Sequence, residues 1–161
     1  MSKQKEVKTN AMRILDKLKI DYQHQTYESD EFVDGMETAD KLGLPYELVY
    51  KTLVTVGKSE DYFVFVIPIA AELDMKKAAR SVAEKSIAMI HVKDLTQVTG
   101  YVRGGCTSIG MKKQYKTIIS DTAKDLDKIY VSGGKIGSQL KLSPDDLCET
   151  VNAVYADIIL T

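Results

Sequence analysis

The stretch KTLVTVGKSEDYFVFVIP, residues 51–68, contains the clearest strand patterns of the chain. Its first part, TLVTVG (52–57), is rich in β-branched residues, and YFVFVIP (62–68) is almost entirely apolar. A continuous apolar run of this length is typical of a strand that is buried on both faces. Only the polar residues KSED separate the two runs, so we predict a hairpin whose second strand is central in a sheet.

Helical and extended patterns alternate on both sides of this hairpin. The segment 9–20 predicts a helix that begins at Thr9 or Asn10 and buries one apolar face. Further helices are expected at 36–45, ending near Gly43, at 74–83 with Asp74 as its cap, at 94–100, and after the cap Ser143. Further strands are expected at 21–28, 87–92, 115–120, 128–134, 138–142 and 155–160. The face of the first helix is expected to contain Ala11, Ile14, Leu15 and Leu18.

The order of these elements predicts one domain over residues 1–161. No repeat, linker or low-complexity segment interrupts the pattern. Many of the expected strands are joined by links of hairpin length, which favours antiparallel pairing. We therefore predict a mixed α/β fold, similar to the α+β class, with a central, largely antiparallel, barrel-like sheet and helices around it.

Composition excludes several classes of protein. Of the 161 residues, 44% are hydrophobic and 28% charged, which is ordinary for a globular protein. The longest apolar run, residues 62–71, is half the length of a membrane span, and the N-terminus lacks an apolar signal segment. Two cysteines without a CxxC pattern suggest reduced thiols. We expect a cytoplasmic protein without a membrane segment.

The net charge of −1 argues against a protein that binds nucleic acid through bulk electrostatics. The charges are unevenly distributed, because KKAAR (76–80) and KKQYK (112–116) are basic while residues 28–40 are acidic. These runs are either the solvated faces of helices or a shallow basic patch that makes weak, salt-sensitive contacts with a polyanion.

Two glycine-rich segments could hold a ligand. In GYVRGGCTSIG (100–110), glycines allow the backbone to approach a ligand and to point several N–H groups at one oxygen. The alternative is a simple turn. VSGGKIG (131–137) is a second turn of the same kind. Cys106 has no recognisable histidine partner, which favours a small packing residue over a nucleophile.

Lys51 is the third candidate, because it lies between apolar residues at the start of a buried strand. Its ammonium group either faces a cleft or reaches water at the end of the strand. The two histidines, His24 and His91, are far apart, and no histidine or cysteine cluster has zinc spacing. We therefore expect neither a metal nor a cofactor.

Taken together, these segments resemble the YbaK/EbsC family of trans-editing enzymes, the Cys-tRNA(Pro)/Cys-tRNA(Cys) deacylases. The resemblance rests on TNAMRILDKLKIDYQHQTYE, KLGLPYELVYKTLV, AELDMKKAAR, TGYVRGGCTSIGMKK, TIIS and IYVSGGKIG, which occur in order along nearly the whole chain. It implies a substrate of misacylated tRNA, bound at its acceptor end, and prolyl-tRNA synthetase as a possible partner. It also implies that the thiol of the substrate cysteine attacks its own ester, so that Cys106 is a bystander.

The resemblance also implies a set of site residues. The catalytic residues would be Lys51, Gly104 and Gly105, and the substrate would be bound by Tyr22, Thr52, Cys106, Thr107, Ser108, Ser132, Gly133 and Gly134. Two positions depart from the family pattern, since Ser108 replaces a proline and Gln139 replaces an acidic residue. These departures leave two alternatives open: removal of alanine or another small amino acid, and a non-catalytic module that binds an aminoacyl-adenosine or a nucleotide.

Overall fold

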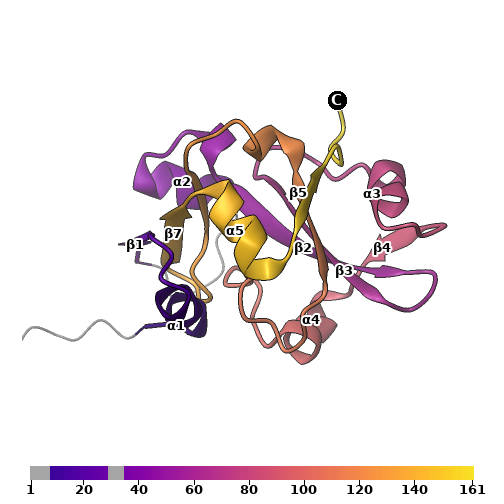
Figure 1. Ribbon diagram of the computed structural model, residues 1–161, viewed down its shortest axis with the longest axis horizontal. Helices are drawn as coiled ribbons and strands as arrows, with labels where there is room; N and C mark the ends of the chain where they lie inside the picture. The colour runs from indigo at the N-terminus through magenta and orange to yellow at the C-terminus, as the bar shows by residue number, and fades with distance from the viewer. Residues whose placement is uncertain (1–7, 29–34) are drawn as a thin grey trace, which may run out of the picture.

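The hairpin predicted from residues 51–68 is formed by β2 (Tyr50–Gly57) and β3 (Tyr62–Pro68). A computed structural model describes residues 8–28 and 35–161 of the chain. In it, β2 and β3 are the second and third strands of a five-stranded sheet with the order β4-β2-β3-β5-β8 (Figure 1). The other three strands form a second sheet with the order β1-β7-β6. The remaining strands are β1 (Gln23–Thr26), β4 (Ile87–Met89), β5 (Lys116–Ser120), β6 (Ile129–Ser132), β7 (Ser138–Leu142) and β8 (Val154–Ala156).

The pairing of the strands confirms the mixed α/β class and corrects one detail of it. In the described part of the chain, four of the six strand pairings are antiparallel, while β3–β5 and β5–β8 are parallel. The predicted barrel-like closure is wrong. The two sheets are joined by an isolated bridge between Val49 and Tyr130. The five-stranded sheet ends in β4 and β8, and these strands of three residues each are too short to continue the pairing into a ring.

Three of the described α-helices, α1, α3 and α5, begin at a residue whose side chain caps the helix. Thr9 accepts a hydrogen bond from the N–H of Met12, Asp74 from those of Lys76 and Lys77, and Ser143 from that of Asp146. The predicted strand at 87–92 is shorter than expected, because a helix already begins at Val92 after His91. The α-helices are α1 (Asn10–Lys17), α2 (Gly35–Leu42), α3 (Met75–Ser81), α4 (Val92–Thr99) and α5 (Pro144–Val151).

The first helix buries a slightly different face from the one predicted. Ala11, Met12 and Leu15 are at most 1% exposed, whereas Leu18 is 51% exposed. Leu18 lies at the C-cap, where the helix ends, so the helical spacing that would bury it no longer applies. The predicted face is therefore confirmed for Ala11 and Leu15 and wrong for Leu18.

The core extends over both faces of β3, because this strand is buried on both sides. Val66 packs with residues of α1, α5, β6 and β7, and this cluster joins the two sheets. Phe65 and Ile67 point to the other face, where they pack against α3. Figure 1 shows α5 lying across the front of the molecule between β7 and β5. Successive side chains of β3 point to opposite faces of the sheet, so that Val66 contacts the cluster with α1 and α5, and Phe65 and Ile67 contact the cluster with α3.

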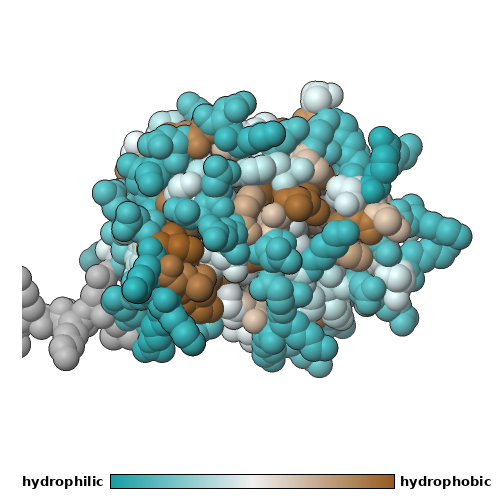
Figure 2. Space-filling model, in the orientation of Figure 1, coloured by the Kyte–Doolittle hydropathy of each residue, from teal (hydrophilic) through white to brown (hydrophobic). Residues whose placement is uncertain are grey.

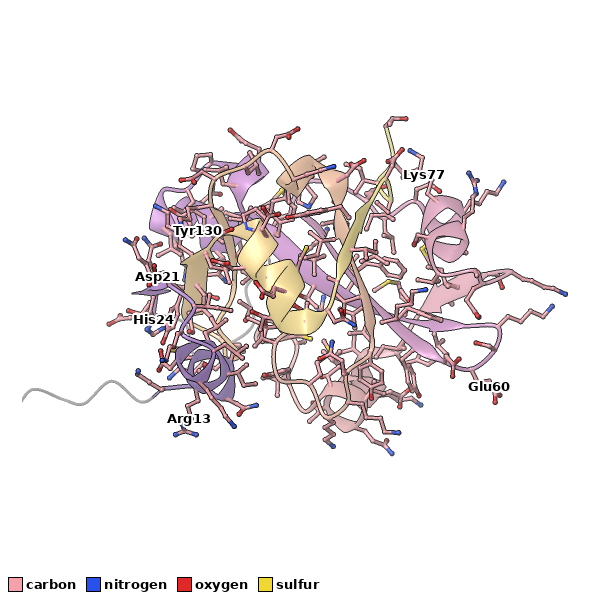
Figure 3. The ribbon with its side chains drawn as sticks, in the orientation of Figure 1. Arg13, Asp21, His24, Glu60, Lys77 and Tyr130 are labelled. Atoms are coloured by element: carbon pink, nitrogen blue, oxygen red, sulfur yellow. The ribbon has the colours of Figure 1, made fainter. Side chains whose placement is uncertain are left out.

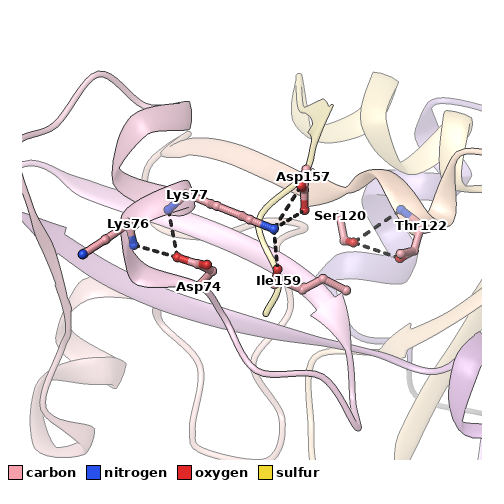
Figure 4. A network of polar contacts seen from close by, with 7 residues as sticks. All are labelled: Asp74, Lys76, Lys77, Ser120, Thr122, Asp157 and Ile159. Atoms are coloured by element: carbon pink, nitrogen blue, oxygen red, sulfur yellow. Dashed lines mark hydrogen bonds and ion pairs between the residues drawn. The ribbon is translucent and has the colours of Figure 1, made fainter. Parts of the chain in front are cut away.

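Side-chain bonds fix α3 to the C-terminal segment. Lys77 donates hydrogen bonds to the carboxylate of Asp157, at 3.1 and 3.2 Å, and to the carbonyl oxygen of Ile159 at 3.1 Å. Figure 4 shows this lysine between the helix and the end of the chain, with the Asp74 cap beneath it and the Ser120–Thr122 pair nearby. These bonds hold α3 over the sheet.

The surface is mostly hydrophilic on the face shown in Figure 2, where the hydrophobic patches are small and separated. Eight large hydrophobic side chains are notably exposed in the described residues, among them Val92, Val102 and Val154. Within residues 8–28 and 35–161, the helices are all too short and too polar to span a membrane.

Candidate functional site

One edge of β2 has pairing partners near its two ends and none in the middle. The bridge between Val49 and Tyr130 lies just before β2 begins, and β4 pairs with β2 only from Thr55 onward. Among the described residues, no strand pairs with the stretch between them on this edge. Backbone N–H and C=O groups alternate between the two edges of a strand. Since the carbonyl oxygen of Val54 accepts from Ile90 on this side, the peptide groups of Thr52 face the same edge.

A cavity of about 380 Å³ lies at this edge, and we call it the edge cavity. This volume lies within the usual range for sites that bind small molecules. Its walls come from α2, from β2 and the residue before it, from α4, and from both glycine-rich segments. The lining residues are Gly35, Met36, Thr38, Val49, Tyr50, Lys51, Thr52, Leu53, Ile69, Leu95, Arg103, Gly104, Cys106, Ser132 and Gln139.

Lys51 and Thr52 reach this cavity from opposite faces of the sheet. Lys51 is opposite Ile67 and Thr52 is opposite Val66, and these two residues of β3 face different parts of the core. Both residues line one cavity, which lies at the uncovered edge of the strand. Lys51 and Thr52 therefore border the same space.

The glycine loop is held in place by close packing on the second glycine turn. A Cβ atom at Gly105 would lie 2.8 Å from the Cα atom of Lys135, so only glycine fits here. Gly104 has a φ of 86°, which other residues rarely adopt. The N–H of Gly105 donates to the carbonyl oxygen of Val102 at 3.0 Å. Gly105 therefore closes the turn, and Gly104 is the member of the pair that lines the cavity.

The second turn has a similar division of roles. Ser132 lines the cavity and accepts a hydrogen bond from the N–H of Gly134 at 3.2 Å. Gly133 donates its N–H to the carbonyl oxygen of Ser138, and a Cβ atom here would lie 2.1 Å from the Ser138 hydroxyl oxygen. Gly133 and Gly134 thus shape the turn and are not among the cavity-lining residues.

Cys106 lines the cavity as a neutral thiol. Burial raises its pKa from 9.0 to about 12, although a hydrogen bond with Thr99 opposes this shift. A thiol with such a pKa carries almost no thiolate near neutral pH. Cys106 is therefore a poor nucleophile and a poor metal ligand. No group of three or more potential metal-binding side chains occurs in the part of the chain that the structure describes.

Comparison with known proteins identifies the family of this chain. A family model described as an aminoacyl-tRNA editing domain matches residues 33–150. The chain belongs to this family. Its sequence is 41% identical over 160 residues to EbsC of Enterococcus faecalis, a candidate Cys-tRNA(Pro)/Cys-tRNA(Cys) deacylase, and the match covers 98% of each chain. The resemblance drawn from the sequence motifs is confirmed.

Solved structures share the fold of this editing domain. A candidate trans-editing enzyme for prolyl-tRNA synthetase has a TM-score of 0.80 at 18% identity, with 97% of this chain and all of that one covered. The hypothetical protein APE2540 has a TM-score of 0.85 at 19% identity and covers 94% of this chain. At these identities, the similarity establishes the fold.

The structure brings together only part of the site predicted for an editing domain. The cavity contains Lys51, Thr52, Gly104, Cys106 and Ser132, whereas Gly105, Gly133 and Gly134 support its loops. Thr107 is fully buried and Ser108 is 7% exposed, and neither lines the cavity. Tyr22 donates to Asp16 at 3.0 Å and, with His24, borders a separate hollow beside α1. Figure 3 shows His24 close to Asp21 on this side of the molecule.

Other lining residues were not predicted as part of the site. Met36 and Thr38 come from α2, whose position beside β2 is a tertiary contact without a local signal. Arg103 directly precedes the glycine pair, and its position could have indicated a cation beside the loop. Gln139 was noted only as a departure from the family pattern, yet it is opposite Ser132 on the neighbouring strand.

Proposed function

We propose that this editing domain removes the amino acid from misacylated tRNA, with Cys-tRNA(Pro) as its main substrate. The bond that breaks is the ester between the amino acid and the 3′-terminal ribose. The edge cavity has room for an amino acid, and its cations can bind the negatively charged acceptor end. The named activity of the 41% identical relative supports the same assignment.

The observation that carries the mechanism is the absence of an activated nucleophile among the described residues of the cavity. A serine or threonine nucleophile needs a base, commonly a histidine. The chain has two histidines, and neither His24 nor His91 lines the cavity. The thiol of Cys106 is kept neutral by burial. We therefore assign the attack to a group of the substrate.

The substrate cysteine can supply this group itself. Its sulfur forms a bond to the ester carbonyl carbon, and the bond from that carbon to the ribose oxygen breaks. The proton of the thiol passes to the departing ribose oxygen. The products are tRNA with a free 3′-hydroxyl and a cyclic thioester of cysteine, which water later opens.

The protein stabilises the negative charge that develops on the carbonyl oxygen. Backbone N–H groups of the glycine loop are suited to this role, since preorganised donors cost no rearrangement during the reaction. Lys51 adds a positive charge at the same cavity. The N–H of Gly105 is already bonded to Val102, so we place the donor role on the loop residues that line the cavity, Gly104 and Cys106.

Recognition of the correct tRNA requires more than this cavity. A cavity of this size surrounds an amino acid and little beyond the terminal nucleotide. We therefore propose that prolyl-tRNA synthetase, which forms the misacylated species, presents it to this domain in the cytoplasm.

The test compares Cys-tRNA(Pro), Ser-tRNA(Pro) and Ala-tRNA(Pro) with the enzyme far below the substrate concentration. Serine and cysteine differ by one atom, and small size differences in a pocket give only about 10–200-fold discrimination. If the substrate thiol attacks, the turnover rate falls much further for the serine ester, while its binding changes little. Equal turnover of the cysteine and serine esters would assign the attack to water, and multiple turnover of the alanine ester alone would change the substrate. Protection of all three esters would make the domain a binding module.

A further inference from the structure

The charges around the edge cavity are unevenly divided between its walls. One wall comes from α4 and the glycine loop that follows it, within residues 91–116. Against one carboxylate, Asp94, this segment contains the cations Lys93, Arg103, Lys112, Lys113 and Lys116. The wall from α2 contains two carboxylates, Glu37 and Asp40, and one lysine. Because the whole chain has a net charge of −1, the excess of cations beside the glycine loop is a local feature.

Lys135 brings a further cation from the second glycine turn to the same wall. Its Cα atom is 2.8 Å from the position that a Cβ atom would take at Gly105. Gly105 lies between Gly104 and Cys106, which both line the edge cavity. The side chain of Lys135 is exposed. The close packing of the two glycine segments therefore places an exposed lysine beside the part of the loop that lines the cavity.

Lys112 lies where the glycine loop returns to α4. Its N–H donates to the carbonyl oxygen of Thr99 at 3.1 Å, and the side chain of Thr99 is hydrogen-bonded to the cavity-lining Cys106. The Cγ atom of Lys112 is 3.4 Å from the position of a Cβ atom at Gly100, so the lysine stem covers the start of the loop. The residue is nevertheless exposed. Its apolar stem is thus fixed on the protein while its ammonium group faces water.

The two basic runs noted in the sequence have different surroundings. In KKAAR (76–80), Lys77 is paired with Asp157, and α3 contributes no residue to the edge cavity. Figure 1 shows α3 and α4 well apart. In contrast, the ammonium groups of Lys112 and Lys135 form no hydrogen bond or ion pair with the rest of the described chain. Only the run at 112–116 therefore lies beside the cavity.

The chemistry of the substrate matches this distribution of charge. When the aminoacyl end of a tRNA occupies the edge cavity, the preceding nucleotides must leave through its mouth, and each carries a phosphate. Lysine binds phosphate as a point charge, without regard to base sequence. We infer that Lys112 and Lys135 bind phosphates of the nucleotides that precede the terminal adenosine, so that the acceptor strand leaves the cavity over the glycine loop. This inference rests on the proposed function.

The experiment compares Cys-tRNA(Pro) with 2′(3′)-O-cysteinyl-adenosine, which has the same ester and the same base but no phosphate. The double variant Lys112→Gln/Lys135→Gln removes both charges and keeps most of each stem. For Cys-tRNA(Pro) at low ionic strength, it is expected to lower kcat/KM by about 10-fold, within the range for two exposed charge contacts. The loss is expected mainly in KM, because these contacts are the same before and during the reaction. For the nucleoside ester, kcat/KM is expected to stay within about twofold.

The dependence on salt provides a second readout. A plot of log kcat/KM for Cys-tRNA(Pro) against log salt concentration is expected to have a negative slope in the wild type. In the double variant, the slope is expected to be shallower by about 1.4, since each phosphate of a single strand contributes about 0.7. The nucleoside ester is expected to show no difference in slope between the two proteins. An unchanged slope for Cys-tRNA(Pro) would overturn the inference.

Lys58→Gln/Lys76→Gln is the matched control, because it removes two exposed lysines that lie outside the edge cavity and changes the net charge equally. It is expected to keep kcat/KM for Cys-tRNA(Pro) within about twofold. An equal loss in this control would make net charge the cause, and an equal loss for both substrates in Lys112→Gln/Lys135→Gln would place the effect in the loop itself. Either result would overturn the inference. Failure of the wild-type protein to cleave either ester would instead contradict the proposed function.

Discussion

β2 and β3 are neighbours in one hairpin, but β3 is paired along both edges and β2 has an interrupted edge. In β3, every residue from Val64 to Ile67 is fully buried. In β2, the residues from Lys51 to Leu53 are only partly buried and line the edge cavity. The comparison shows that β3 contributes mainly to stability, whereas β2 contributes residues to the cavity. A strand paired on both sides uses its peptide groups for the fold, whereas an uncovered edge leaves them available to a ligand.

The largest expected effect is a loss of stability in β3. Phe65 is fully buried between β2 and β5, so Phe65→Ala should lower the free energy of unfolding by about 3–5 kcal/mol. Denaturant titration measures this loss. Deacylation per folded molecule should change little at low temperature, because Phe65 does not line the cavity. A variant of normal stability, or one that is stable but inactive, would contradict the division between the strands.

The second prediction concerns Lys51 on the other strand. Lys51→Ala should lower the deacylation rate by at least about 100-fold, the effect of losing one preorganised group that stabilises an oxyanion. Lys51→Arg should also be slow, because a planar guanidinium replaces a compact ammonium. Circular dichroism and unfolding should remain close to those of the wild type.

Lys58→Ala is the control for this prediction. Lys58 is an exposed lysine in the turn of the same hairpin, outside the edge cavity. It should retain normal activity. A deacylation rate for Lys51→Ala close to that of Lys58→Ala would contradict a role for Lys51 in the site.

The smallest effect is expected for Cys106. Cys106→Ser and Cys106→Ala should keep the turnover rate within a few-fold of the wild type, because a neutral thiol supplies no nucleophile. Iodoacetamide should modify Cys106 slowly at neutral pH in the folded protein. Complete loss of turnover in both folded variants would require a covalent mechanism in place of attack by the substrate.

Because burial raises the pKa of the Cys106 thiol, we expect the free energy of unfolding to depend on pH. Its folded pKa of about 12 lies above the ordinary value of 9.0, so the folded protein keeps a proton that the unfolded chain loses. The contribution of the protonated thiol to the free energy of unfolding is complete below pH 9 and disappears as the pH rises toward 12. Between these values, the free energy of unfolding falls by up to about 1.4 kcal/mol per pH unit. Cys106→Ser should reduce this slope in unfolding measurements between these pH values.

Local signals in the sequence predicted most of the elements. Thr9, Asp74 and Ser143 cap the helices that they were expected to begin, and the hairpin forms at residues 51–68. These features depend on residues that are neighbours in the chain, so a pattern of a few positions contains them. Leu18 was misplaced because the helix ends one residue earlier, and the exact end of a helix is a weak signal.

The sequence by itself determined the mixed α/β class, the central hairpin, the two glycine turns and the family. It also indicated Lys51, Thr52, Gly104, Cys106 and Ser132 as candidates, and all five line one cavity. Only the tertiary structure decided that the sheets do not close and that Tyr22 lies beside a different hollow. It also decided that Gln139 on β7 lines the same cavity as these residues. The closure of the sheets and the walls of the edge cavity depend on which distant segments pair or pack beside β2, and such long-range contacts leave no pattern in neighbouring residues.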